Sequence, residues 1–157
     1  MKDKQNLSAT ARTFLHLLNT TSPELVEFIE IVSPSKENPW IEEVGSIILK
    51  IPSPTGSKPE YLYLETRKRS IVIVVGTLLN YHVDWSAKDE IKESIQKAIQ
   101  FFLDIMEERK VILEKKIGIA FLKWNFVRCI DTAMIARQTG NFTIYSWKGT
   151  HNRSSTK

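Results

Sequence analysis

The sequence contains one short cluster of side chains with the chemistry for proton transfer. His82 and Asp84 are separated by a single residue, so in an extended chain both point to the same side. A carboxylate can orient an imidazole for acid–base work, and the pair could also ligate a metal ion. Two ligands are too few for a stable metal site, however. We interpret His82, Asp84 and the adjacent Trp85 as a structural polar cluster, and expect no catalytic residue, no metal and no cofactor.

The single cysteine, Cys129, is the other candidate for reactive chemistry. A nucleophilic thiol needs a nearby base, and the adjacent residues offer none. Val127 and Ile130 lie close by in the sequence, which favours a buried, unreactive thiol. The chain also lacks a Walker loop, a glycine-rich dinucleotide fingerprint and an HExxH zinc motif. These features predict a protein that is not an enzyme.

The charges are distributed unevenly along the chain. Residues 22–66 contain eight glutamates and three lysines, whereas the last 41 residues carry six basic side chains against Asp131 alone. Such asymmetry indicates either a surface for a charged partner or mixed, solvated faces. The residues that we predict to contact a partner are Glu24, Glu27, Glu30, Glu42, Glu43, Tyr61, Tyr63 and Glu65.

Nucleic acid is the alternative partner, and the basic end of the chain carries that interpretation. Phosphate contacts would come from Arg67, Lys68 and Arg69 at a turn together with Lys148 and Arg153 near the end, and stacking platforms from Tyr61, Tyr63, Tyr145 and Trp147. These basic residues lie at a turn and in a tail, where solvated charges are common. Nucleic acid is therefore the less favoured partner.

The elements that must position these residues predict an α+β fold. A hairpin is predicted from two strands joined by a short turn, in which successive side chains alternate between the two faces. The strands are Tyr61 to Thr66 and Ser70 to Val75. Apolar residues then recur at helical spacing over 87–109, which predicts one long amphipathic helix. The expected architecture is a single domain over 1–157, mainly an antiparallel sheet packed against this helix, with residues 1–6 and 150–157 frayed.

Two shorter helices are predicted near the N-terminus, over residues 8–19 and 23–32. Ser8 is a suitable cap for the first. Ser22 and Pro23 open the second, in which Glu24, Glu27 and Glu30 would form one stripe, although its β-branched residues leave a strand open.

The cellular location is inferred from what the sequence lacks. One cysteine excludes an internal disulfide, as is typical of a reducing compartment. The longest apolar run, Ile71 to Val75, is far shorter than the ~20 residues of a membrane helix. Phe14 to Leu18 is too short for the apolar core of a signal peptide. We expect a cytoplasmic protein without a membrane segment.

The order of motifs over residues 60–150 resembles the small bacterial immunity proteins of polymorphic-toxin and contact-dependent growth inhibition systems. The residues that carry the resemblance are Val74, Val75, Gly76, His82, Asp84, Trp85, Ser146, Trp147 and Gly149. The chain departs from the pattern at Asp84, where a second histidine is usual, and in its insertion from Pro52 to Pro59. The resemblance implies a non-enzymatic inhibitor that binds a cognate toxin in the cytosol, and the acidic residues 22–66 would suit a basic nuclease toxin.

Overall fold

The computed structural model describes residues 6–119 and 122–156. The α+β class and the antiparallel strands that the sequence predicts are confirmed. The strands form two sheets instead of one, with the orders β1-β2-β3-β4-β5 and β7-β6-β8-β9. The chain also divides into two compact units, the first holding most of the five-stranded sheet and the second holding the four-stranded sheet.

The first helix, α1 (Ala9–Thr21), begins where its cap predicts. The Ser8 side-chain oxygen accepts a hydrogen bond from the Ala11 backbone N–H at 3.2 Å, which satisfies one of the free donors of the first turn. Phe14 and Leu18 of this helix are buried. The predicted helix over 8–19 is therefore confirmed, with two further residues at its end.

The predicted helix over 23–32 is wrong in its second half. Residues Pro23–Phe28 form a short 3₁₀ helix, η2, and Ile29–Val32 then form the edge strand β1. Strand β1 pairs antiparallel with β2 (Ser46–Pro52), so that Ile31 lies opposite Ile47. The β-branched side chains favour this pairing over continued helix, as the strand alternative anticipated.

The remaining strands of the first sheet follow one another along the chain. The β3–β4 hairpin is confirmed, and its turn closes where the Arg67 N–H donates to the Ser70 carbonyl at 2.9 Å. Beyond the hairpin, the residues expected to lead into the helix form a further edge strand. The strands are β3 (Tyr61–Thr66), β4 (Ser70–Val75) and β5 (Leu79–Asp84).

The long helix is present but shorter than the predicted 87–109. A 3₁₀ turn, η3 (Lys88–Glu90), precedes α2 (Ile91–Met106). The Glu90 carboxylate accepts hydrogen bonds from the Ser86 and Ala87 N–H groups at 3.3 and 3.4 Å. Glu108 takes a φ of 58°, in the left-handed region, which ends the helix and turns the chain into the next strand.

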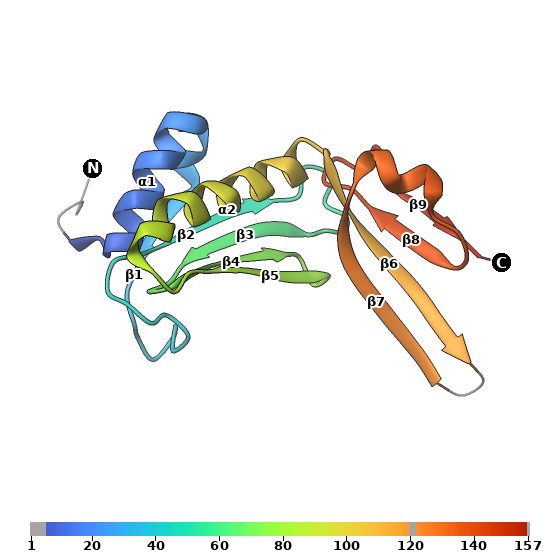
Figure 1. Ribbon diagram of the computed structural model, residues 1–157, viewed down its shortest axis with the longest axis horizontal. Coiled ribbons are helices and arrows are strands. Elements are labelled where there is room, and N and C mark those ends of the chain that lie inside the picture. Colours follow the sequence, from blue (N-terminus) through green and yellow to red (C-terminus); the bar gives the residue numbers. More distant parts are fainter. Residues whose placement is uncertain (1–5, 120–121, 157) are drawn as a thin grey trace. The chain divides into compact units, whose positions relative to one another are not determined.

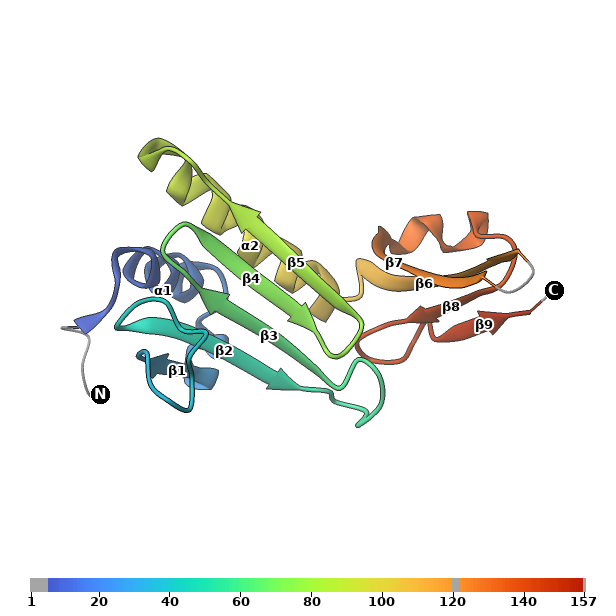
Figure 2. The same cartoon turned by 90° about the horizontal axis from the view of Figure 1, so that it is seen from below.

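Both α-helices lie on one face of the five-stranded sheet (Figures 1 and 2). The fully buried side chains of the strands and of α2 form the core of this unit. They include Ile47 and Leu49 of β2, Leu62 and Leu64 of β3, Ile71 and Ile73 of β4, and Ile95 and Phe102 of α2. Among the described residues of the first unit, no helix covers the opposite face, which Figure 2 shows from the front. We call this the open face of the sheet.

The second unit is built around a long hairpin, β6 (Lys110–Ile119) and β7 (Leu122–Asp131). The 3₁₀ helix η4 (Thr132–Arg137) leads to β8 (Phe142–Tyr145), which pairs with β6. Leu113, Ile130 and Ile144 belong to its core. The tail predicted to fray over 150–157 instead contains β9 (Arg153–Ser155), which pairs with β8. Of the N-terminal residues predicted to fray, residues 1–5 lie outside the described part.

Candidate functional site

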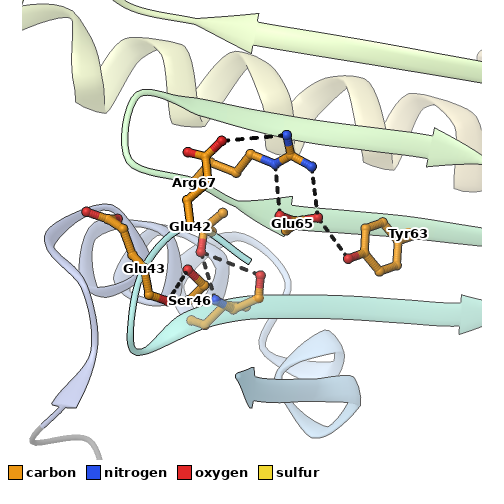
Figure 3. Close-up of polar contacts among 8 residues, drawn as sticks. Glu42, Glu43, Ser46, Tyr63, Glu65 and Arg67 are labelled. Atoms are coloured by element: carbon orange, nitrogen blue, oxygen red, sulfur yellow. Dashed lines mark hydrogen bonds and ion pairs between the residues drawn. The ribbon is translucent and has the colours of Figure 1, made fainter. Parts of the chain in front are cut away.

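A buried carboxylate lies on the open face of the sheet, in strand β3. Glu65 is only 2 % exposed, and it accepts a hydrogen bond from the Tyr63 hydroxyl at 3.0 Å. The Arg67 guanidinium donates to both oxygens of Glu65, at 2.8 Å from Nε and 3.4 Å from Nη2 (Figure 3). Residues at i and i+2 share a face of a strand, which is why the sequence brings these three together.

The environment of this trio shifts the pKa values of Tyr63 and Arg67. Burial raises the pKa of Tyr63, and the charge and hydrogen bond of Glu65 raise it further. Burial opposes the charge of Arg67, but the hydrogen bond and the charge of Glu65 outweigh that effect and raise the Arg67 pKa. Tyr63 therefore remains a hydrogen-bond donor and Arg67 a cation, and both hold the buried Glu65 carboxylate.

The loop over residues 33–45 lies beside this trio. The Glu42 carboxylate lies 3.9 Å from Arg67 Nη1, so the guanidinium is flanked by Glu42 and Glu65 (Figure 3). Nearby Trp40 acts to lower the Tyr63 pKa, against the larger raising effect of burial. Glu43 is half-buried, and its carbonyl accepts from the Ser46 hydroxyl at 3.0 Å.

Glycine 45 holds this loop against the start of the chain. Its φ is 73°, and an added Cβ would lie 1.8 Å from the Asn6 carbonyl oxygen. Its carbonyl accepts from the Ser8 N–H at 3.0 Å, and its N–H donates to the Ser33 hydroxyl at 3.4 Å. Ile41 anchors the middle of the loop, being 3 % exposed. The loop therefore has a defined conformation, in which Trp40, Glu42 and Val44 are exposed.

The remaining acidic residues of the predicted contact set are distributed over the preceding elements. Glu24 and Glu27 are exposed on η2, and Glu30 is exposed on β1 opposite Ile48. Tyr61 is half-buried at the start of β3, on the same face as Tyr63. The structure thus brings Glu42, Tyr63 and Glu65 into one cluster and leaves Glu24 and Glu27 outside it.

Exposed apolar side chains also occur between Glu24 and Val44, a stretch that we call segment 24–44. Phe28, Ile31, Trp40 and Val44 are 43, 40, 51 and 63 % exposed. Elsewhere in the described chain, Tyr81 and Met134 are comparable. The sequence reading did not select these four residues. No local pattern in the sequence marks these four side chains as exposed.

The charge of this stretch is opposite to that of the chain as a whole. Residues 22–45 hold six glutamates and one lysine, a net charge of −5. The whole chain carries +4, so the other residues together carry +9. Large exposed apolar patches rimmed by polar residues mark sites of protein–protein interaction.

The predicted polar cluster at residues 82–85 is divided by the structure. Tyr81 stacks on Phe101 of α2 with ring centroids 4.2 Å apart, so alternation places His82 and Asp84 on the opposite side of β5. Both are exposed, whereas Trp85 is buried at 6 % exposure. At the helix start, the Glu90 carboxylate accepts from the N–H groups of Ser86 and Ala87.

A second buried carboxylate, Glu108, organises the segment from Ser146 to Asn152. It accepts hydrogen bonds from the backbone N–H groups of Lys148 at 2.7 Å and Thr150 at 3.4 Å. The Asn152 side chain accepts from the Ser146 N–H at 2.7 Å. This is the Ser-Trp-x-Gly stretch of the sequence, and its polar residues hold a turn together.

The environment of Cys129 supports an unreactive thiol. Burial raises its pKa to about 12; nearby Lys110 acts in the opposite direction, and Asp131 adds to the increase. At neutral pH the group is therefore a thiol and a poor nucleophile. Among the described residues, no group of three or more His, Cys, Asp and Glu side chains is placed to hold a metal ion.

The basic residues proposed for nucleic acid have mixed surroundings. Trp147 is buried at 3 % exposure, so its ring is not available as a stacking platform. Arg153 donates to the Ile135 carbonyl at 2.7 Å and lies over the Phe142 ring. The Tyr145 hydroxyl donates to Glu114 at 2.9 Å. Lys68, Arg69 and Lys148 are exposed.

Searches against protein-family models, curated proteins and solved structures gave no match to this chain. Within residues 6–119 and 122–156, none of the helices is long and apolar enough to cross a membrane. A function must therefore be argued from the residues themselves, and above all from segment 24–44.

Proposed function

We propose that this chain is a cytoplasmic immunity protein that binds and neutralises a cognate protein toxin without catalysis. The observation that supports this most is segment 24–44, where exposed Phe28, Ile31, Trp40 and Val44 coincide with a net charge of −5 over residues 22–45. Tryptophan and other large side chains surrounded by polar groups carry much of the affinity of protein interfaces.

The sign of the charge favours a basic protein as the partner. Acidic side chains repel phosphate, so this segment is unsuited to nucleic acid, whereas it would steer a basic toxin domain toward the surface. The polar groups most eligible for chemistry are otherwise engaged, since Glu65 is held by Tyr63 and Arg67. The Cys129 thiol, with its raised pKa, is equally unsuited to catalysis. These features support binding as the activity.

The test is protection from a toxin encoded beside this chain. We expect the full-length protein to form a stable complex with that toxin domain and to rescue cells that express it. Replacing Trp40 and Val44 together by alanine should weaken the complex, because both side chains are more than half exposed in the free protein. A matched control is Lys92→Ala, at an exposed site on α2 away from segment 24–44.

Two results would overturn the proposal. One is turnover of a substrate by the purified chain alone. The other is tight, salt-dependent binding to DNA or RNA with no protection from the toxin, which would favour the nucleic-acid alternative through Lys68, Arg69 and Lys148.

A further inference from the structure

The indole of Trp40 is held in an exposed position by its neighbours. The next residue, Ile41, is 3 % exposed and its N–H donates to the Asn38 carbonyl at 3.2 Å. Gly45 closes the loop against Asn6. With these anchors in place, Trp40 remains 51 % exposed, so its flat ring is available to a partner without any rearrangement of the loop.

The Glu42 carboxylate in the same loop is free to accept a further hydrogen bond. The Glu42 side chain is 55 % exposed, and its contact with Arg67 is 3.9 Å long, at the outer limit of an ion pair. Arg67 makes its short contact with Glu65 instead, at 2.8 Å. Glu42 can therefore accept a second cation without breaking the buried pair.

An exposed aromatic ring and an exposed carboxylate two residues apart in one loop match the chemistry of a guanidinium group. Arginine stacks on tryptophan through cation–π attraction, and its planar fork donates two hydrogen bonds to one carboxylate. Lysine offers only a compact, strongly hydrated charge, so it fits such a site less well. The net charge of −5 over residues 22–45 adds a general attraction for a basic segment.

We propose that Trp40 and Glu42 form the docking site for an arginine side chain on a basic segment of the partner. This inference rests on the proposed function, which it makes more specific by naming the chemistry of the partner. Tyr63 lies near this site, since Trp40 acts on its pKa, and its hydroxyl is fixed by Glu65.

The experiment is an NMR titration of the full chain with triarginine and trilysine peptides, which carry equal charge. The Trp40 indole N–H signal, assigned by its loss in Trp40→Ala, should shift and saturate with triarginine. Trilysine should bind at least about threefold more weakly. Glu42→Gln should weaken triarginine binding by about tenfold, and Trp40→Phe should retain part of it. Glu93→Gln, an exposed glutamate on α2, is the matched control and should change nothing.

Equal binding of the two peptides, or triarginine binding unaffected by Trp40→Phe and Glu42→Gln, would overturn the inference, since both results mean unspecific attraction. The outcome is separable from the proposed function. If the unmodified chain protects against the toxin and the Trp40 and Glu42 variants protect equally, only the arginine site fails. If the unmodified chain gives no protection, the proposed function fails whatever the peptides do.

Discussion

The carboxylate of Glu108 accepts a hydrogen bond from the backbone N–H of Lys148, 40 residues later in the chain, at 2.7 Å. Glu108 also stands in the left-handed backbone region, which is unusual for a residue with a side chain. One residue thus ends helix α2 and holds the turn that follows β8. The stability of the second unit should depend on it.

Replacing Glu108 by alanine should lower the free energy of unfolding by about 1–3 kcal/mol, because the N–H groups of Lys148 and Thr150 would lose their acceptor. Glu108→Gln keeps one acceptor oxygen and should cost less. Equilibrium denaturation of the two variants measures the difference. Equal stability of Glu108→Ala and the unmodified chain would contradict the assignment.

The same carboxylate should make stability depend on pH. Burial opposes its charge, but hydrogen bonds from Thr150, Ser146 and the Lys148 N–H outweigh burial and lower the Glu108 pKa. A lowered folded-state pKa means that the contribution is fully present above the unfolded value of about 4.3 and is lost as pH falls through the folded value. The stability gap between the unmodified chain and Glu108→Gln should therefore shrink below about pH 4. A gap that grows on acidification would contradict this sign.

Removal of the Arg67 guanidinium should be costly because its partner cannot be solvated. Arg67→Ala leaves the Glu65 carboxylate buried at 2 % exposure, and we expect a loss of up to about 3 kcal/mol. Tyr63→Phe removes one hydrogen bond to Glu65 and should cost about 1 kcal/mol. Thermal or chemical unfolding measures both. Lys97→Ala, which breaks the exposed pair with Glu93, should have a marginal effect, and an equal loss in all three variants would refute the role of burial.

Gly45→Ala should disrupt the loop beside Trp40. The new Cβ would lie 1.8 Å from the Asn6 carbonyl oxygen, at a φ of 73°. Gly56→Ala is the matched control, because Gly56 has a φ of 67° but no atom within 4 Å of the added Cβ. Both variants bear the backbone strain of about 1–2 kcal/mol, and only Gly45→Ala adds the clash. Similar melting temperatures for the two would mean that the contact with Asn6 is unimportant.

The Cys129 thiol should react slowly in the folded protein. Burial is the main cause that raises its pKa to about 12. At pH 8, a disulfide reagent such as DTNB should label the native chain at least about a hundredfold more slowly than the unfolded chain. Spectrophotometric labelling with and without denaturant gives the ratio. Fast labelling of the native chain would show that the thiol is activated.

The hairpin β3–β4 and the helix α1 could be predicted because their signals are local: alternation, a charged turn and a serine cap. For Ile29–Val32 the local sequence left both helix and strand open, because the choice depends on pairing with β2, a contact that the local sequence does not encode. The end of α2 was missed for a similar reason. Glu108 leaves the helical region to reach a partner 40 residues away, whereas its own side chain is a good helix former.

In the candidate site, too, some features could be predicted from local sequence and others could not. The cluster of Glu42, Tyr63 and Glu65 was partly anticipated from charge and from strand alternation. Trp40 was not, because sequence gives no measure of how far an apolar side chain in a loop remains exposed. The polar pair His82 and Asp84, the most conspicuous feature of the sequence, lies exposed on an edge strand.

Every strand of the five-stranded sheet pairs with its neighbour along the chain, in the order β1-β2-β3-β4-β5. In such a meander, strands that pair are consecutive in the chain, so folding should need few long-range encounters. During synthesis, β1 and β2 can pair before β5 has been made, and α2 can then cover strands already in place. Truncated chains that stop after β4 should consequently show partial protection of β2–β3 amides in hydrogen exchange, so that the sheet would begin to assemble from its N-terminal side.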